Sequence, residues 1–175
     1  MLLSFIAFTL AAQTAGLPQP AANPTHSVPS PTKLPPANPL APPDGSDERA
    51  VLATVDKLLG GINTRDAAVI GAVLLPSASA TIVTDAADGP GTVRTLTNAE
   101  LLARFQSGPE TFDERISSPA VEIDGDLAMV WAPYVFRLNG KVHHCGTDHF
   151  SLVRENGAWK IASLAWTSRT TGCAE

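Results

Sequence analysis

Residues 123–158 read IDGDLAMVWAPYVFRLNGKVHHCGTDHFSLVRENGA, and the turn signals in this stretch decide the fold. Asp124-Gly125, Asn139-Gly140 and Asn156-Gly157 each stand between runs rich in β-branched and aromatic residues. Such pairs favour tight β-hairpins, because Asn, Asp and Gly tolerate the positive φ that these turns require. The sequence therefore predicts an antiparallel meander. Its predicted strands are residues 116–123, 127–138, 142–155 and 158–167.

The segment before the meander carries helical patterns. Apolar residues three and four positions apart from Val51 to Ile62 predict an amphipathic helix, which Gly60-Gly61 would end or fray. A shorter helix is expected over residues 66–75, and the capping box at 97–100 starts a third. Helices first and a meander last around one core define an α+β fold. The remaining predicted strands are the short β-branched runs 79–84 and 93–96.

Composition divides the chain into three parts. Residues 1–16 are apolar, end in small residues and are too short to span a bilayer, which takes about 20 apolar residues. They are typical of a signal peptide, so we expect a protein exported to the periplasm or secreted. Ten of the 15 prolines lie in residues 17–46, which are expected to form a disordered linker. Residues 47–175 are long enough for one domain with one hydrophobic core.

The charge distribution excludes one class of partner. The chain has 12 Lys and Arg against 17 Asp and Glu, with a formal net charge of −5. No basic stripe runs along the predicted domain, so no nucleic-acid partner is expected.

Residues 143–149 read HHCGTDH and raise the question of a metal site. Side chains alternate along a strand, so His143, Cys145 and His149 face one way while His144 and Asp148 face the other. Four residues along a strand span about 13 Å, too far for His144 and Asp148 to share one ion. His143 and Cys145 could share a metal, but two ligands do not make a zinc site. No metal is predicted, and no other cofactor is expected. Cys145 and Cys173 are instead expected to form a disulfide, because an exported chain meets an oxidising compartment.

The Asn139-Gly140 turn also predicts which residues share a face. A two-residue turn would place Trp131 opposite Asp148 and Val135 opposite His144. Trp131, His144 and Asp148 would then share the more apolar face, which should pack on the helices, although a bulge would change this assignment. The other face would carry Tyr134 and Trp166.

The plan of helices followed by a curved meander resembles the nuclear-transport-factor-2-like superfamily. This superfamily includes SnoaL-like cyclases, ketosteroid isomerase and the putative lumazine-binding proteins. The resemblance covers about residues 47–173 and rests on 123–128, 130–134, 144–146, 150–154 and 157–161. It implies a cone-shaped fold with a cavity between helices and sheet. It also implies a homodimer, which we expect to form through the Tyr134/Trp166 face.

Three functions remain open, because fold alone does not establish activity. The first is binding of a small apolar or aromatic molecule, stacked on Trp131 with its polar end near His144 and Asp148. The second is an isomerase, dehydratase or cyclase with Asp148 or His144 as general base. The third is a protein-interaction module carried on the proline-rich tether.

Overall fold

The computed structural model describes residues 44–85 and 90–174, so the predicted signal peptide and most of the predicted linker lie outside the described residues. Three helices occur in these ranges: α1 (Asp47–Thr64), α2 (Ala67–Val73) and α3 (Asn98–Leu102). Each begins at a side-chain cap, because its first backbone N–H groups need acceptors. Ser46 caps α1, Asp66 caps α2, and Thr97 with Glu100 forms the predicted capping box of α3.

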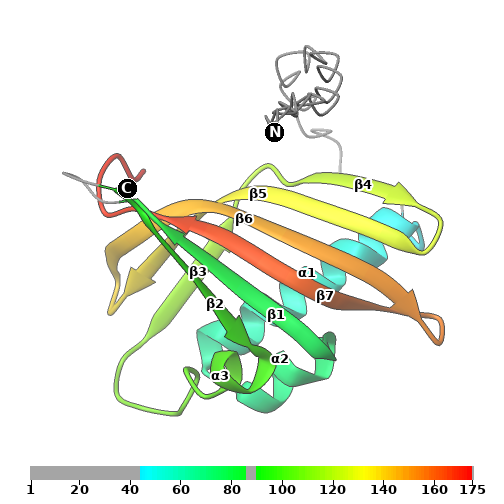
Figure 1. Cartoon of the computed structure of the whole chain (residues 1–175), viewed down its shortest axis with the longest axis horizontal. Helices are drawn as coiled ribbons and strands as arrows, with labels where there is room; N and C mark the ends of the chain where they lie inside the picture. Colours follow the sequence, from blue (N-terminus) through cyan, green and yellow to red (C-terminus); the bar gives the residue numbers. More distant parts are fainter. Residues whose placement is uncertain (1–43, 86–89, 175) are drawn as a thin grey trace, which may run out of the picture. The chain divides into compact units, whose positions relative to one another are not determined.

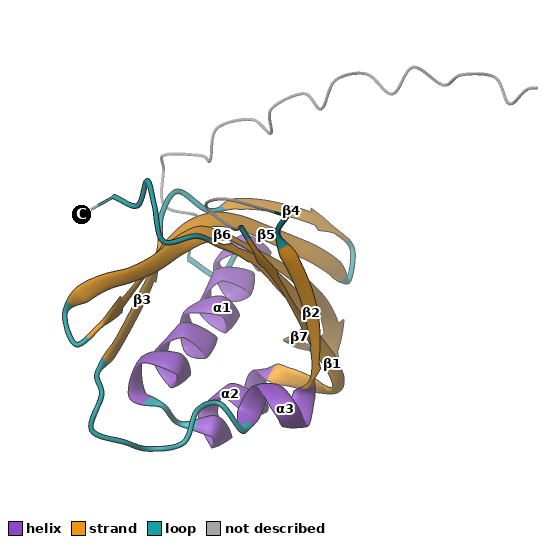
Figure 2. Cartoon of the chain, turned by 60° about the vertical axis from the view of Figure 1, so that its left-hand side comes forward, coloured by secondary structure: helices purple, strands orange, loops and turns teal. Residues whose placement is uncertain are grey.

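Seven strands form one curved, mostly antiparallel sheet in the order β2-β1-β7-β6-β5-β3, with β4 also paired to β5. The helices pack on its concave side, and α1 lies beneath the curve (Figure 2). The predicted α+β fold is therefore confirmed. The strands are β1 (Leu74–Thr84), β2 (Thr92–Thr97), β3 (Phe112–Ile116), β4 (Ala120–Asp124), β5 (Leu127–Leu138), β6 (Lys141–Glu155) and β7 (Ala158–Ser168).

The meander of β4 to β7 forms as the turns predict (Figure 1). Asn139 and Gly140 have φ values of 52° and 77°, which is the conformation expected of a hairpin turn built on an Asn-Gly pair. The predicted strand over 116–123 is instead two strands, because the chain turns at Ser118 with a φ of 45°. The parallel pairing of β1 with β7 was not predicted.

The prediction that Gly60-Gly61 ends the first helix is wrong. Helix α1 continues to Thr64, and Arg65 in the left-handed region closes it. A Cβ atom at Gly61 would lie 2.8 Å from Cγ1 of Ile70, so glycine at this position allows α2 to pack closely on α1. The glycine serves helix packing and not helix termination.

A β-bulge changes the predicted register of β5 against β6. Arg137 pairs with Val142 as the turn requires, but Phe136 then pairs with His144, which leaves His143 as the extra residue. The shift places Trp131 opposite His149 and brings Ala132 opposite Asp148. A one-residue slip moves every side chain to the other face of a strand.

A second register shift, in which Leu152 pairs with Ile161 but Ser151 pairs with Ser163, moves β7 in the same way. The face assignments on β5 and β7 are therefore wrong. Trp131 lies on the outer face and is 45% exposed. Tyr134 is 3% exposed on the inner face, and Trp166 lines the same concave side, so the Tyr134/Trp166 surface is unavailable for the predicted dimer. On β6, the side chains of His144 and Asp148 point inward, as predicted.

The predicted disulfide between Cys145 and Cys173 is present, with a Cα–Cα distance of 5.6 Å. The tail returns to β6 through a backbone bridge between Cys145 and Arg169, and Gly172 with a φ of 67° completes the turn. Within residues 44–85 and 90–174 no helix has the length and apolarity to cross a membrane. The same ranges contain no cluster of three His, Cys, Asp or Glu side chains that could hold a metal ion.

Candidate functional site

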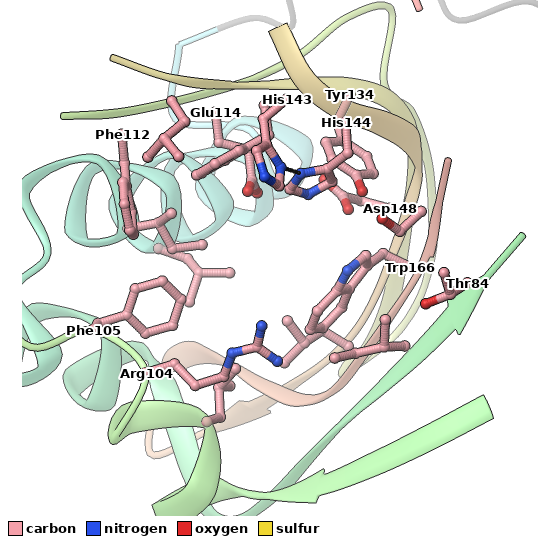
Figure 3. A pocket seen from close by; sticks show the side chains of 18 of the residues that line it. Thr84, Arg104, Phe105, Phe112, Glu114, Tyr134, His143, His144, Asp148 and Trp166 are labelled. Carbon is pink, nitrogen blue, oxygen red and sulfur yellow. Dashed lines mark hydrogen bonds between the residues drawn. The ribbon is translucent and has the colours of Figure 1, made fainter. Parts of the chain in front are cut away.

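A cavity of ≈ 560 Å³ lies between the concave face of the sheet and the helices. Its volume falls within the range of small-molecule pockets. More than half of the residues of its wall are apolar or aromatic, with rings from several elements, and the others are polar or charged (Figure 3). The aromatic members of the wall are Phe105, Phe112, Tyr134, Phe136, Phe150 and Trp166.

Asp148 is the most unusual member of this wall. It lies in the middle of β6, opposite Ala132 on β5 and Trp166 on β7, so all three side chains share the inner face. It is 6% exposed and is the only buried charged residue in the part of the chain that the structure describes. Its Oδ2 atom is buried and has no hydrogen-bond partner among the described residues. Such an oxygen destabilises the fold unless something binds it.

Glu114 brings a second carboxyl group to the cavity from β3. Its backbone is held by the side chain of Asn63 on α1. The Glu114 N–H donates to Oδ1 of Asn63 at 2.6 Å, and Nδ2 of Asn63 donates to the Glu114 carbonyl at 3.1 Å. These two hydrogen bonds hold β3 against α1 and so fix the position of the Glu114 backbone, from which its side chain extends.

The two carboxyl groups titrate as a pair. Burial, and after it the nearby charge of Glu114, raise the pKa of Asp148 to about 9. Burial also raises the pKa of Glu114 to about 7. Like charges in one desolvated site oppose joint ionisation. At neutral pH the pair therefore keeps at least one proton.

Tyr134 on β5 is the third polar group of this wall. Its hydroxyl donates to the carbonyl of Thr167 at 2.9 Å, which leaves its oxygen as an acceptor. Burial raises its pKa, and the charges of Asp148 and Glu114 add to that rise, so the phenol stays neutral. Gly146 makes this contact possible, because a Cβ at that position would collide with the Thr167 carbonyl.

His144 and His143 occupy one edge of the cavity. Their Nδ1 atoms are 2.9 Å apart, so one ring donates to the other. His144 stacks on Phe136 with ring centroids 4.7 Å apart. Burial lowers the pKa of His144 to about 4, and the charges of His143 and Arg104 act in the same direction. His144 is therefore neutral at neutral pH.

The structure brings together two of the three predicted ligand-binding residues. His144 and Asp148 line the cavity, whereas Trp131 packs on the outer face beside His149, with ring centroids 6.0 Å apart. Trp166 takes the place that sequence reasoning assigned to Trp131. Sequence reasoning missed Glu114 and Tyr134, and only the pairing of β3 with β5 reveals that they share a wall.

A curved sheet closed by helices around a cavity with a few inward polar groups is the architecture of nuclear-transport-factor-2-like proteins. The chain belongs to one family within that class. Residues 46–167 match the family described as "Putative lumazine-binding". No curated protein sequence matches the chain.

Solved structures agree on the fold. A nuclear-transport-factor-2-like protein of unknown function from Shewanella baltica is 16% identical, with a TM-score of 0.53 over 74% of this chain and 98% of its own. A nuclear-transport-factor-2-like protein from Cytophaga hutchinsonii is 16% identical, with a TM-score of 0.58 over 71% of this chain and 99% of its own. The beta subunit of a putative aromatic-ring-hydroxylating dioxygenase from Novosphingobium aromaticivorans is 11% identical, with a TM-score of 0.57 over 72% and 91%. At these identities the likeness concerns the fold alone.

Proposed function

We propose that this chain is an exported protein that binds a small, largely apolar molecule in its cavity, with the polar end of that molecule at Asp148. The buried, unpartnered Oδ2 of Asp148 carries the proposal, because it faces an apolar cavity of ≈ 560 Å³. Apolar walls supply most of the binding free energy, and a few polar groups orient the ligand. Trp166, next to Asp148 on the inner face, supplies a flat surface for stacking.

The test is native mass spectrometry of the full chain purified from its producing cells, followed by titration of whatever molecule is retained. Asp148→Asn should lower the affinity for that molecule by about tenfold, which is the usual effect of losing one polar contact. If Asp148→Asn lowers the melting temperature and leaves affinity unchanged, Asp148 is a structural residue and the binding role is wrong.

Catalysis is the second candidate function, with Asp148 as general base in an isomerase, dehydratase or cyclase reaction. The raised pKa of Asp148 favours it over His144, because a carboxylate of high pKa is a strong base whereas His144, with its pKa lowered to about 4, is a weak one. A rate that rises with pH towards about 9 supports this assignment. An acidic limb near 4 in the rate profile would point to His144 instead.

We further propose export and self-association. The apolar segment 1–16 and the disulfide support export, since disulfides persist in oxidising compartments. The outer face supports a homodimer, because Trp131 and Leu127 are 45% and 53% exposed there. Light scattering checks it: a monomer at micromolar concentration contradicts the dimer, and Trp131→Glu should dissociate one.

A further inference from the structure

We propose that the ligand's polar end is a positively charged nitrogen, so that the cavity recognises an ammonium group carried on an apolar or aromatic body. The inference rests on the proposed binding function and specifies the class of ligand. Its basis is the juxtaposition of two carboxyl groups with aromatic rings on one buried wall (Figure 3).

The carboxyl groups have no cationic partner of their own. The ion pairs within residues 44–85 and 90–174 involve neither Asp148 nor Glu114. Oδ2 of Asp148 also has no hydrogen-bond donor there. A buried carboxylate is normally paired or hydrogen-bonded. A ligand that brings a positive charge and N–H groups would supply what Asp148 lacks.

The surfaces around Asp148 suit a cation as well. Trp166 and Ala132 are its cross-strand neighbours, and Phe150 follows two positions later on the same face. The methyl group of Ala132 takes little room on that side. The electron-rich faces of aromatic rings attract ammonium groups, and Trp does so most strongly. The carboxyl group of Asp148 and the ring of Trp166 can therefore both contact the ammonium group of the ligand.

The other charged groups that line the cavity form no ion pair with Asp148 or Glu114 among the described residues. Arg94 comes from β2, Arg104 from α3, and Glu110 from the segment before β3. Figure 3 shows Arg104 on the side of the cavity opposite His144 and Tyr134. The remaining titratable groups that face the carboxyl pair are Tyr134, which stays neutral, and His143 and His144, of which His144 is neutral at neutral pH.

Binding of such a ligand has a defined proton balance. In the free protein the carboxyl pair retains at least one proton, because burial raises the pKa of both groups. A permanently charged ammonium favours the ionised carboxylate, so the O–H bond of one carboxyl breaks and its proton passes to solvent. Affinity for this ligand should therefore rise with pH across the range between about 7 and about 9.

Three probes of one shape test the inference by isothermal titration calorimetry of the full chain. They are (2-naphthylmethyl)trimethylammonium, 2-naphthalenemethanol and 2-naphthoate, which share the aromatic body and differ in charge. At pH 8 the cation should bind at least about tenfold more tightly than the alcohol. Naphthoate should be the weakest. Titration in buffers of different ionisation enthalpy should show release of up to one proton per bound cation.

Two matched variants locate the effect. Asp148→Asn should abolish the preference for the cation and the proton release while the alcohol still binds. Glu122→Gln makes the same change of carboxyl to amide at an exposed position on β4 and should leave both unchanged. Circular dichroism melting checks that Asp148→Asn is folded. Glu114→Gln removes the other carboxyl group of the pair and should reduce the preference for the cation over the alcohol.

The outcomes distinguish failure of the ammonium inference from failure of the proposed binding function. If the alcohol or naphthoate binds as tightly as the cation, the ammonium inference is wrong and the binding function stands. A cation preference that survives in Asp148→Asn also overturns it. If none of the three probes binds, both the inference and the proposed function are contradicted for ligands of this size.

Discussion

The two halves of the concave sheet face treat a charged side chain differently. In one half, the guanidinium of Arg154 lies over the ring of Trp159 and pairs with Asp47 at 2.7 Å and Asp126 at 3.1 Å. In the other half, Asp148 is more deeply buried and its Oδ2 has no partner among the described residues. Both halves use the same strands, β6 and β7. In the first half the charged group is paired with two carboxylates, whereas in the second half Asp148 forms no ion pair and lies beside a cavity.

Side-chain packing explains the difference. Helix α1 places Val51, Val55 and Leu58 in the core cluster with Leu152 and Ile161 of the sheet. Towards the other end of these strands, the cavity takes the place of such a core. A substitution that shortens a side chain should therefore have different effects in the two halves.

The largest effect is expected from Leu152→Ala in the packed half. Leu152 is 0% exposed, so the substitution leaves a cavity that its neighbours cannot fill. The free energy of unfolding should fall by about 4 kcal/mol in urea denaturation. Leu138→Ala, at a half-buried position on the cavity wall, is the control and should lower it by about 1 kcal/mol. Equal losses would contradict the division into a packed half and an open half.

The disulfide should contribute almost as much from the cavity half. It joins Cys145 and Cys173 across a sequence separation of 28, and in the chain-entropy model its removal costs about 3–4 kcal/mol. The double variant Cys145→Ser/Cys173→Ser should lower the unfolding free energy by that amount. Non-reducing peptide mapping of the exported protein is the direct check, and two free thiols there would refute the bond.

The two halves also differ in how far the sequence predicts them. The Asn139-Gly140 and Asn156-Gly157 turns predict the hairpins, and the alternation along β6 correctly places Asp148 and His144 inward. The bulge beside Phe136 has no signal in the sequence, so the faces of β5 come out reversed. A bulge shifts the pairing of two strands by one residue, and tertiary packing decides where along the strands this shift occurs.

Non-local pairing limits the prediction of the site. Glu114 reaches the cavity because β3 pairs with the far half of β5 and because Asn63 of α1 holds its backbone. These contacts join segments far apart in the sequence, so no local pattern indicates them. Asp148 could be named in advance because strand alternation puts it on the same face as Phe150 and Leu152, where a carboxylate is unusual.

A smaller effect is expected from Asp148→Asn on the dependence of stability on pH. Folding raises the pKa of Asp148 from 3.8 to about 9, so its contribution to stability is fully present below about 4 and is lost as pH rises through about 9. The amide does not titrate. The free energy of unfolding of the variant should therefore rise relative to that of the wild type as pH rises, by at least about 1 kcal/mol at pH 8. Urea denaturation from pH 5 to 9 measures the difference, and parallel curves would show that Asp148 has an ordinary pKa.

The smallest effect concerns the acidic side and His144. Folding lowers the pKa of His144 from 6.5 to about 4, so the stability linked to its neutral form is present above about 6.5 and is lost as pH falls through about 4. His144 is only half-buried, so solvent screening reduces the contribution to about 1 kcal/mol. His144→Gln should remove this part of the acid dependence and leave the alkaline dependence set by Asp148 unchanged. Nuclear magnetic resonance titration of the imidazole gives the same answer without a substitution: a midpoint near 6.5 would mean that the ring is solvated and that the cavity edge is more open than the geometry indicates.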